Sequence, residues 1–172
     1  MPRVLTRLLA ALAAGLVITL TCLLSAAPAQ AQVWAVPAAD LSVDPTVNLD
    51  EFENQLMGSI NQVRANAGLK PVRYYDSCVD QLAESWATRI ATTGALEHRD
   101  QNIVLRRCDQ AWAGEDLVRG TLLTPSIVVQ AWMDSPSHRE ILLKKRASRA
   151  GIAISLDGSG RFVGVLNFTD NR

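Results

Sequence analysis

The run from residue 131 to residue 143, AWMDSPSHREILL, constrains the fold most, because it marks the end of one helix and the start of another. Apolar residues at helical spacing predict that the first helix buries a face made of Ile127, Val128, Ala131 and Trp132. At the junction, the Ser135 side chain can cap the free N–H groups of a new helix, and Pro136 suits its first position. His138 then lies in the first turn of the new helix, which we expect the core to anchor through Ile141, Leu142 and Leu143.

His138 is one of two histidines in the chain, and the other is His98. The positive end of a helix dipole disfavours a charged imidazole. We therefore expect His138 to be neutral and able to ligate a metal or accept a hydrogen bond. Glu115 lies between the histidines and directly follows Gly114. Spacing alone does not distinguish a joint site from two unrelated histidines at the surface or in the core.

The N-terminus has the three parts of a secretory signal peptide. Arg3 and Arg7 make it positive, residues 8–27 are almost wholly apolar, and Ala29-Gln30-Ala31 presents small residues where a signal peptidase cuts. We expect residues 1–31 to be removed, which makes the protein extracellular with no stable membrane span. The apolar run is also long enough to cross a bilayer, so an uncleaved anchor is the alternative.

Cleavage would leave about 140 residues, which suits one domain with a single core. The full chain has no formal net charge, and without Arg3 and Arg7 it has 15 basic and 17 acidic residues. This balance gives no reason to expect nucleic-acid binding. Residues 32–49 contain two prolines and no apolar period, which predicts a leader before a domain at residues 50–172.

Loss of the signal peptide removes Cys22 and leaves Cys78 and Cys108. An even pair of cysteines in an exported protein predicts a disulfide. It would close a loop of about 30 residues and contribute about 3 kcal/mol to stability. Two reduced thiols are disfavoured by export, and a Cys–His metal site is disfavoured by the lack of a close Cys-x-x-Cys pair.

Periodicity and capping residues predict the remaining elements. The expected helices begin at Asn48 or Asp50, at Asp76 or Ser77, and at Thr124. The first two end near Gly68 and Gly94. The expected β segments are residues 72–75, 112–119, 150–156 and 162–168, the last two forming a hairpin, and residues 99–111 are expected to be a loop. The pattern predicts a three-layer α-β-α sandwich around a short, mainly antiparallel sheet.

Five features occur in a characteristic order: NQVRANAGLKPV at residues 61–72, a helix with Trp86 that leads to His98, GEDL at 114–117, WMDSPSHR at 132–139, and a glycine-rich terminal hairpin. Together they resemble the CAP superfamily of cysteine-rich secretory proteins, antigen 5 and plant pathogenesis-related proteins. The resemblance is greatest to its short secreted bacterial members. It covers about residues 50–168, and its most specific part is the Trp-x-x-Ser-Pro-x-His-Arg run.

The resemblance implies a cleft lined by two histidines and acidic residues, in which some family members bind a divalent metal. His98 matches the first family histidine, and His138 matches the second in its bacterial form. Glu115 matches the glutamate of the family's Gly-Glu-Asn motif. The resemblance thus assigns these three residues as a cleft, with zinc as the candidate metal.

Two positions depart from the family pattern. Asp116 stands where asparagine is usual, so an amide donor is replaced by an acceptor-only carboxylate. Ser135 stands where eukaryotic members have a second cleft glutamate, and the neighbouring Asp134 is a substitute that would point elsewhere. Both departures weaken the transfer of a metal or catalytic role.

Three functions fit these features. The first is an extracellular binding module, because some family members bind sterols, lipids or other small hydrophobic ligands and others act through protein partners. The second is a structural hydrogen-bond network made by His98, Glu115 and His138. The third is a hydrolase in which these residues hold zinc, or Glu115 acts as a general base. We rank the hydrolase last because no activated serine or cysteine nucleophile is evident.

Overall fold

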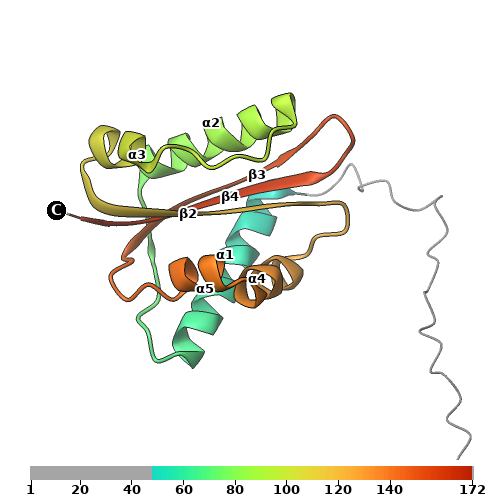
Figure 1. Ribbon diagram of the computed structural model, residues 1–172. Coiled ribbons are helices and arrows are strands. Elements are labelled where there is room, and N and C mark those ends of the chain that lie inside the picture. The colour runs from blue at the N-terminus through green and yellow to red at the C-terminus, as the bar shows by residue number, and fades with distance from the viewer. Residues whose placement is uncertain (1–47, 172) are drawn as a thin grey trace, which may run out of the picture. The chain divides into compact units, whose positions relative to one another are not determined.

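The computed structural model describes residues 48–171, which form five helices and four strands (Figure 1). The helices are α1 (Leu49–Asn66), α2 (Ser77–Thr93), α3 (Gln101–Arg107), α4 (Pro125–Asp134) and α5 (Pro136–Leu142). The strands are β1 (Tyr74–Tyr75), β2 (Gln110–Gly120), β3 (Arg149–Leu156) and β4 (Phe162–Asn171). The expected signal peptide and residues 32–47 of the expected leader lie outside the described residues. Within residues 48–171, no helix is long and apolar enough to cross a membrane.

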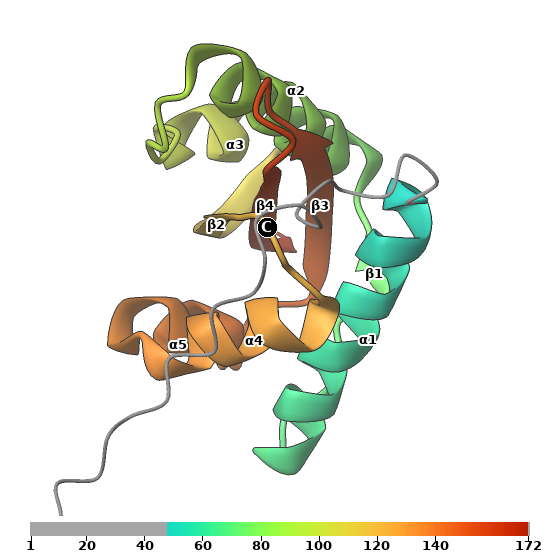
Figure 2. The ribbon, with the colours of Figure 1, turned by 90° about the vertical axis from the view of Figure 1, so that its right-hand side faces the viewer.

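The strands form one sheet in the order β1-β3-β4-β2. β4 is antiparallel to both β3 and β2, whereas β1 is parallel to β3 over two residue pairs. The helices α1, α4 and α5 cover one face of the sheet, and α2 and α3 cover the other (Figures 1 and 2). This arrangement confirms the three-layer α-β-α sandwich and its mainly antiparallel sheet.

Side-chain caps begin three of the helices, as the sequence predicts. Asn48, Asp76 and Thr124 each accept a backbone N–H from the first turn of α1, α2 and α4, at distances between 3.1 and 3.3 Å. Ser135 occupies the capping position of α5, but its side chain makes no capping hydrogen bond. Its hydroxyl lies 3.3 Å from the Ser137 hydroxyl instead, so this part of the prediction was wrong.

The buried face of α4 differs from the predicted one. Val128, Val129 and Trp132 are buried, whereas Ile127 is 48% exposed and Ala131 is also exposed. The Trp132 indole donates to the carbonyl of Leu117 on β2 at 2.9 Å, which fixes the side of the helix that faces the sheet. Ile127 and Ala131 therefore lie on the flank of that face.

The segment expected to be a loop, residues 99–111, contains α3 and the start of β2. Asp100 caps α3 by accepting the N–H of Asn102 at 3.0 Å. Val104 is the one buried residue of this seven-residue helix. A helix this short, with one apolar anchor, shows no period in the sequence, which is why the prediction was wrong.

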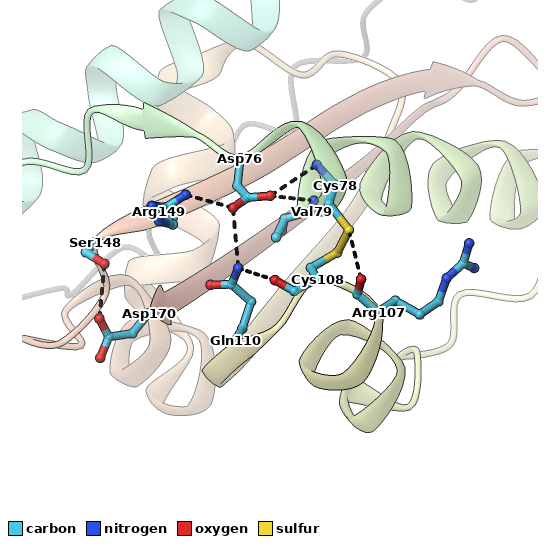
Figure 3. Close-up of polar contacts among 9 residues, drawn as sticks. All are labelled: Asp76, Cys78, Val79, Arg107, Cys108, Gln110, Ser148, Arg149 and Asp170. Atoms are coloured by element: carbon cyan, nitrogen blue, oxygen red, sulfur yellow. Dashed lines mark hydrogen bonds and ion pairs between the residues drawn. A yellow bond between two sulfur atoms is a disulfide. The ribbon is translucent and has the colours of Figure 1, made fainter. Parts of the chain in front are cut away.

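A disulfide joins Cys78 on α2 to Cys108 after α3, confirming the predicted pair (Figure 3). Asp76 lies beside it, where one carboxylate oxygen caps α2. The other oxygen accepts from the Arg149 guanidinium at 2.9 Å and from the Gln110 amide at 3.3 Å. The starts of α2, β2 and β3 are thus held together at this end of the sheet.

A buried arginine connects elements of the helical layer that contains α1 and α5. The side chain of Arg64 on α1 has no exposed surface and lies 5.5 Å over the ring of Phe168. Its guanidinium donates to the carbonyls of Lys70, Leu142, Lys144 and Ala147. Burial lowers the pKa of Arg64 below its ordinary value. The segment that joins α5 to β3 is therefore tied to the end of α1.

Candidate functional site

His98 lies in the loop between α2 and α3, next to the middle of β2. Its Nδ1 is 2.9 Å from Oε1 of Glu115, a residue of β2. The Glu115 side chain is 1% exposed and the His98 side chain is 58% exposed. Because a carboxylate only accepts hydrogen bonds, Nδ1 of a neutral His98 carries the proton and Nε2 keeps a lone pair. The buried acid thus orients an exposed imidazole.

The Glu115 carboxylate has hydrogen bonds on both oxygens. Oε1 also accepts the backbone N–H of Arg99 at 2.9 Å. Oε2 accepts from the side-chain amide of Asn167 at 3.1 Å. Asn167 lies directly opposite Glu115 on β4, so the sheet register brings the two together. Glu115 therefore links the His98 loop to two strands.

Two residues that the sequence analysis did not assign to the site also hold the His98 loop. Arg99 is buried, and its guanidinium donates to the carbonyl of Leu82 and to the Ser85 hydroxyl on α2. The same guanidinium lies 4.8 Å from the ring centre of Trp86. Trp86 in turn donates its indole N–H to the carbonyl of residue 97 at 2.9 Å. Contacts on both sides of His98 thus fix the backbone that carries it.

Trp86 is part of the family pattern, but nothing in the sequence assigns Trp86 or Arg99 to the site. Trp86 fits the apolar stripe of α2, and Arg99 is an ordinary charged residue in a polar segment. Burial lowers the pKa of Arg99, and the nearby Glu115 carboxylate opposes this effect. An arginine is stabilised in such a place by carbonyl acceptors and by an aromatic face, which only the folded chain provides.

His138 is the third residue of α5, in its first turn, as predicted. Burial lowers its pKa, and the positive charge of a protonated His98 lowers it further. Burial is the larger of these two effects, and the helix N-terminus at which His138 lies acts in the same direction. A neutral His138 keeps a lone pair for a hydrogen bond or a metal.

Asp116, the departure from the family's asparagine, has no exposed surface, and neither of its carboxyl oxygens has a hydrogen-bond partner. It points to the α1, α4 and α5 side of β2, opposite to Glu115, because successive strand residues alternate. Burial raises the pKa of Asp116 to about 8, and the Glu115 charge adds to this effect. Asp116 is therefore mostly a neutral acid at pH 7, with no role in the His98 contacts.

A zinc site with three protein ligands does not form in the described part of the chain. Within residues 48–171, no group of three or more His, Cys, Asp or Glu side chains is arranged to hold a metal ion. Both oxygens of Glu115 are already hydrogen-bonded, and Cys78 and Cys108 are joined. The two imidazoles are the remaining candidate ligands from the predicted set.

The site is also separate from three hollows on the surface. The largest, about 600 Å³, lies between α1 and the start of α4. A second, about 500 Å³, lies between α1 and the α4–α5 junction, with Val63 and Met133 in its wall. A third, about 450 Å³, lies between α1 and α2 near Leu156. None of these three is lined by His98, Glu115 or His138.

The family model described as CAP, the cysteine-rich secretory protein family, matches residues 57–168. No curated protein matches the sequence. Among solved structures, an outer surface protein of Borrelia burgdorferi is similar, with 20% identity and a TM-score of 0.65 over 73% of this chain and 97% of that one.

A cysteine-rich secretory protein of Staphylococcus aureus has 20% identity and a TM-score of 0.60, over 74% of this chain and 40% of its own. A further structure, that of NaASP2 with Zn²⁺, has 14% identity and a TM-score of 0.51, over 74% of this chain and 83% of its own. At these identities the similarity establishes the fold.

Proposed function

The chain belongs to the cysteine-rich secretory protein (CAP) family, and on this premise we propose that it is a secreted binding module. His98, Glu115 and His138 form its ligand-binding site, and the ligand is a small hydrophobic molecule or a protein partner. One observation carries the proposal: the Glu115 carboxylate uses both oxygens to orient His98 and to hold Arg99 and Asn167.

The hydrogen bonds of Glu115 support a binding role over a hydrolytic one. A general base needs a lone pair directed at the water that it activates. At Glu115, three donors already bond to the carboxylate oxygens, and the side chain is almost fully buried. This favours an acid that positions His98 over one that accepts a proton during turnover.

The surroundings of His98 suit contact with a partly apolar ligand. The His98 ring is largely exposed, and Leu96, two residues earlier, is 42% exposed. A rigidly held imidazole with a free nitrogen can accept one hydrogen bond from a ligand while apolar neighbours bury its carbon atoms. The contacts of Arg99 and Trp86 reduce the entropy that the loop would lose on binding.

Secretion is the second part of the proposal. The N-terminal motif, the Cys78–Cys108 disulfide and the family match support it. Mass spectrometry of protein from the culture medium should give an N-terminus at Gln32. Recovery only from the membrane fraction, with Met1 retained, would instead identify an anchored protein.

Binding is tested with a fluorescent fatty acid and a fluorescent sterol as probes. We expect one of them to saturate the wild-type protein, and His98→Ala and His138→Ala each to weaken its binding at least about tenfold, the loss of one well-formed contact. Met133→Ala, in the hollow between α1 and α4–α5, is the matched control and should bind as the wild type does. If Met133→Ala instead weakens binding about tenfold and neither histidine variant does, the ligand binds in that hollow.

Zinc titration distinguishes the proposed binding module from a zinc-dependent hydrolase. Zinc is the ion to titrate, because imidazoles are common zinc ligands and the similar structure of NaASP2 was solved with Zn²⁺. If both histidines ligate it, its affinity should fall as the pH drops through about 6.5. Zinc-dependent ester hydrolysis that His98→Ala and His138→Ala both abolish would replace the binding module by a hydrolase.

A further inference from the structure

Two short segments carry much of the positive charge of the domain. Residues 69–73, just before β1, have the sequence LKPVR, and residues 143–149, which lead into β3, have the sequence LKKRASR. These twelve residues include six Lys or Arg and no Asp or Glu, whereas the rest of the described chain has eight basic and fifteen acidic residues. We call the two segments together the basic end.

The fold brings the two segments together although they are far apart in the sequence. The buried Arg64 guanidinium donates to the carbonyl of Lys70 in one segment and to the carbonyl of Lys144 in the other. Directly after Arg73, Tyr74 pairs with Arg149 in the parallel ladder of β1 and β3. Both segments lie at the end of the sheet where the C-terminus lies (Figure 1). Their charges therefore act as one group.

Three of the six cations of the basic end have no acidic partner. The other three form ion pairs at 2.9 to 3.1 Å, which are Lys144–Glu140, Arg146–Asp170 and Arg149–Asp76, the last drawn in Figure 3. Lys70, Arg73 and Lys145 are exposed, and none of them forms an ion pair with a residue between 48 and 171. The basic end thus keeps three positive charges after its ion pairs are counted.

The basic end suits a broad, negatively charged surface better than a small anion. None of its Lys or Arg side chains lines any of the three hollows described above, so these hollows offer no enclosed site for a single anion beside these charges. In the two segments, no large apolar side chain is exposed. Contact with a bilayer would therefore rest on charge and would not insert side chains among the lipid tails.

We propose that the basic end is a docking surface for a lipid bilayer that contains anionic phospholipids. Lys70, Arg73 and Lys145 face the lipid phosphates, because no acid of the described chain shares their charge. The attraction is electrostatic and is screened by salt, so docking is reversible. The surface is separate from the His98 site, and the proposal stands whether or not that site binds a ligand.

Vesicle cosedimentation tests the docking. The protein is the proposed secreted form that begins at Gln32, and the vesicles contain phosphatidylcholine alone or phosphatidylcholine with an equal part of phosphatidylglycerol. The protein should sediment only with the vesicles that contain phosphatidylglycerol, and about 0.5 M sodium chloride should release it. Equal binding to both kinds of vesicle, or binding to neither, would overturn the proposal.

Two double variants locate the contact. Arg73→Gln/Lys145→Gln removes two unpaired charges of the basic end, and Arg89→Gln/Arg139→Gln removes two exposed arginines elsewhere as the matched control. Each Lys or Arg near an anionic surface contributes roughly a fivefold factor in affinity. The first variant should therefore bind the phosphatidylglycerol vesicles at least about tenfold more weakly, and the control should stay within about twofold of the wild type. Equal weakening of both would reduce the effect to net charge and overturn the proposal.

Two further measurements complete the test. Both variants should melt as the wild type does, because neither Arg73 nor Lys145 has a side-chain partner within residues 48–171. A soluble polyanion, dextran sulfate, tests the other kind of occupant. If dextran sulfate binds the wild type but not Arg73→Gln/Lys145→Gln, and phosphatidylglycerol vesicles bind neither, the basic end recognises an anionic polymer and the bilayer proposal is wrong.

Discussion

Asp116→Asn should stabilise this protein, and the gain should depend on pH. In the folded chain, burial and the Glu115 charge raise the pKa of Asp116 from 3.8 to about 8. Between these two pH values the folded state keeps a proton that the unfolded state has released. Rising pH therefore favours unfolding across this window, and below it the residue makes no pH-dependent contribution to stability.

The size of the effect follows from the pKa. One pKa unit corresponds to about 1.4 kcal/mol, so Asp116 lowers the free energy of unfolding by on the order of 4 kcal/mol at pH 7 relative to pH 4. Asparagine has a similar shape and does not titrate, so the variant should lose this dependence. Its gain over the wild type should be close to zero near pH 4 and should increase up to about pH 8.

Urea unfolding at pH 4, 5, 6, 7 and 8, with the disulfide intact, measures this difference. Asp134→Asn is the control, because Asp134 is an exposed aspartate on α4. The control should follow the wild type at every pH. If the free energies of unfolding of Asp116→Asn and the wild type run parallel from pH 4 to pH 8, the assignment of Asp116 as a neutral buried acid is wrong.

Three further substitutions test the contacts that hold the fold and the site. Arg64→Met removes the guanidinium that donates to four carbonyls, two of them (Leu142 and Ala147) through buried hydrogen bonds, and it should lower the free energy of unfolding by about 3 kcal/mol in urea titration. Cys78→Ser/Cys108→Ser should lower it by about 3 kcal/mol, measured in the same way under non-reducing conditions. Arg99→Met should lower the melting temperature and speed hydrogen exchange around His98. Arg89→Met is its control, because Arg89 also lies over Trp86 but is exposed, and it should change stability by less than about 0.5 kcal/mol.

The sequence correctly predicts the structural features that depend on residues close together in the chain. Asn48, Asp76 and Thr124 cap helices by bonding to backbone groups two or three residues away, so their positions predict the helix starts. The hairpin of β3 and β4 is local in the same sense, since a turn of a few residues joins the two strands.

The contacts that the sequence did not predict depend on distant parts of the chain. Arg64 and Arg99 are buried because backbone carbonyls in other elements accept their hydrogen bonds, and no residue pattern indicates such acceptors. Ile127 is an apolar residue at helical spacing that the fold leaves exposed, because Trp132 fixes the orientation of α4. The link between Glu115 and Asn167 is set by the register of β2 against β4.

Nitrogen NMR of the two imidazoles, recorded while a fatty-acid or sterol probe is titrated, tests the proposed binding site most directly. We expect neutral His98 to carry its proton on Nδ1, where Glu115 accepts it, and to lose this preference in Glu115→Ala. The nitrogen resonances of His98 and His138 should then shift together as the probe saturates the protein. A saturating probe that leaves both imidazoles unchanged, or a His98 that carries its proton on Nε2, would contradict the account.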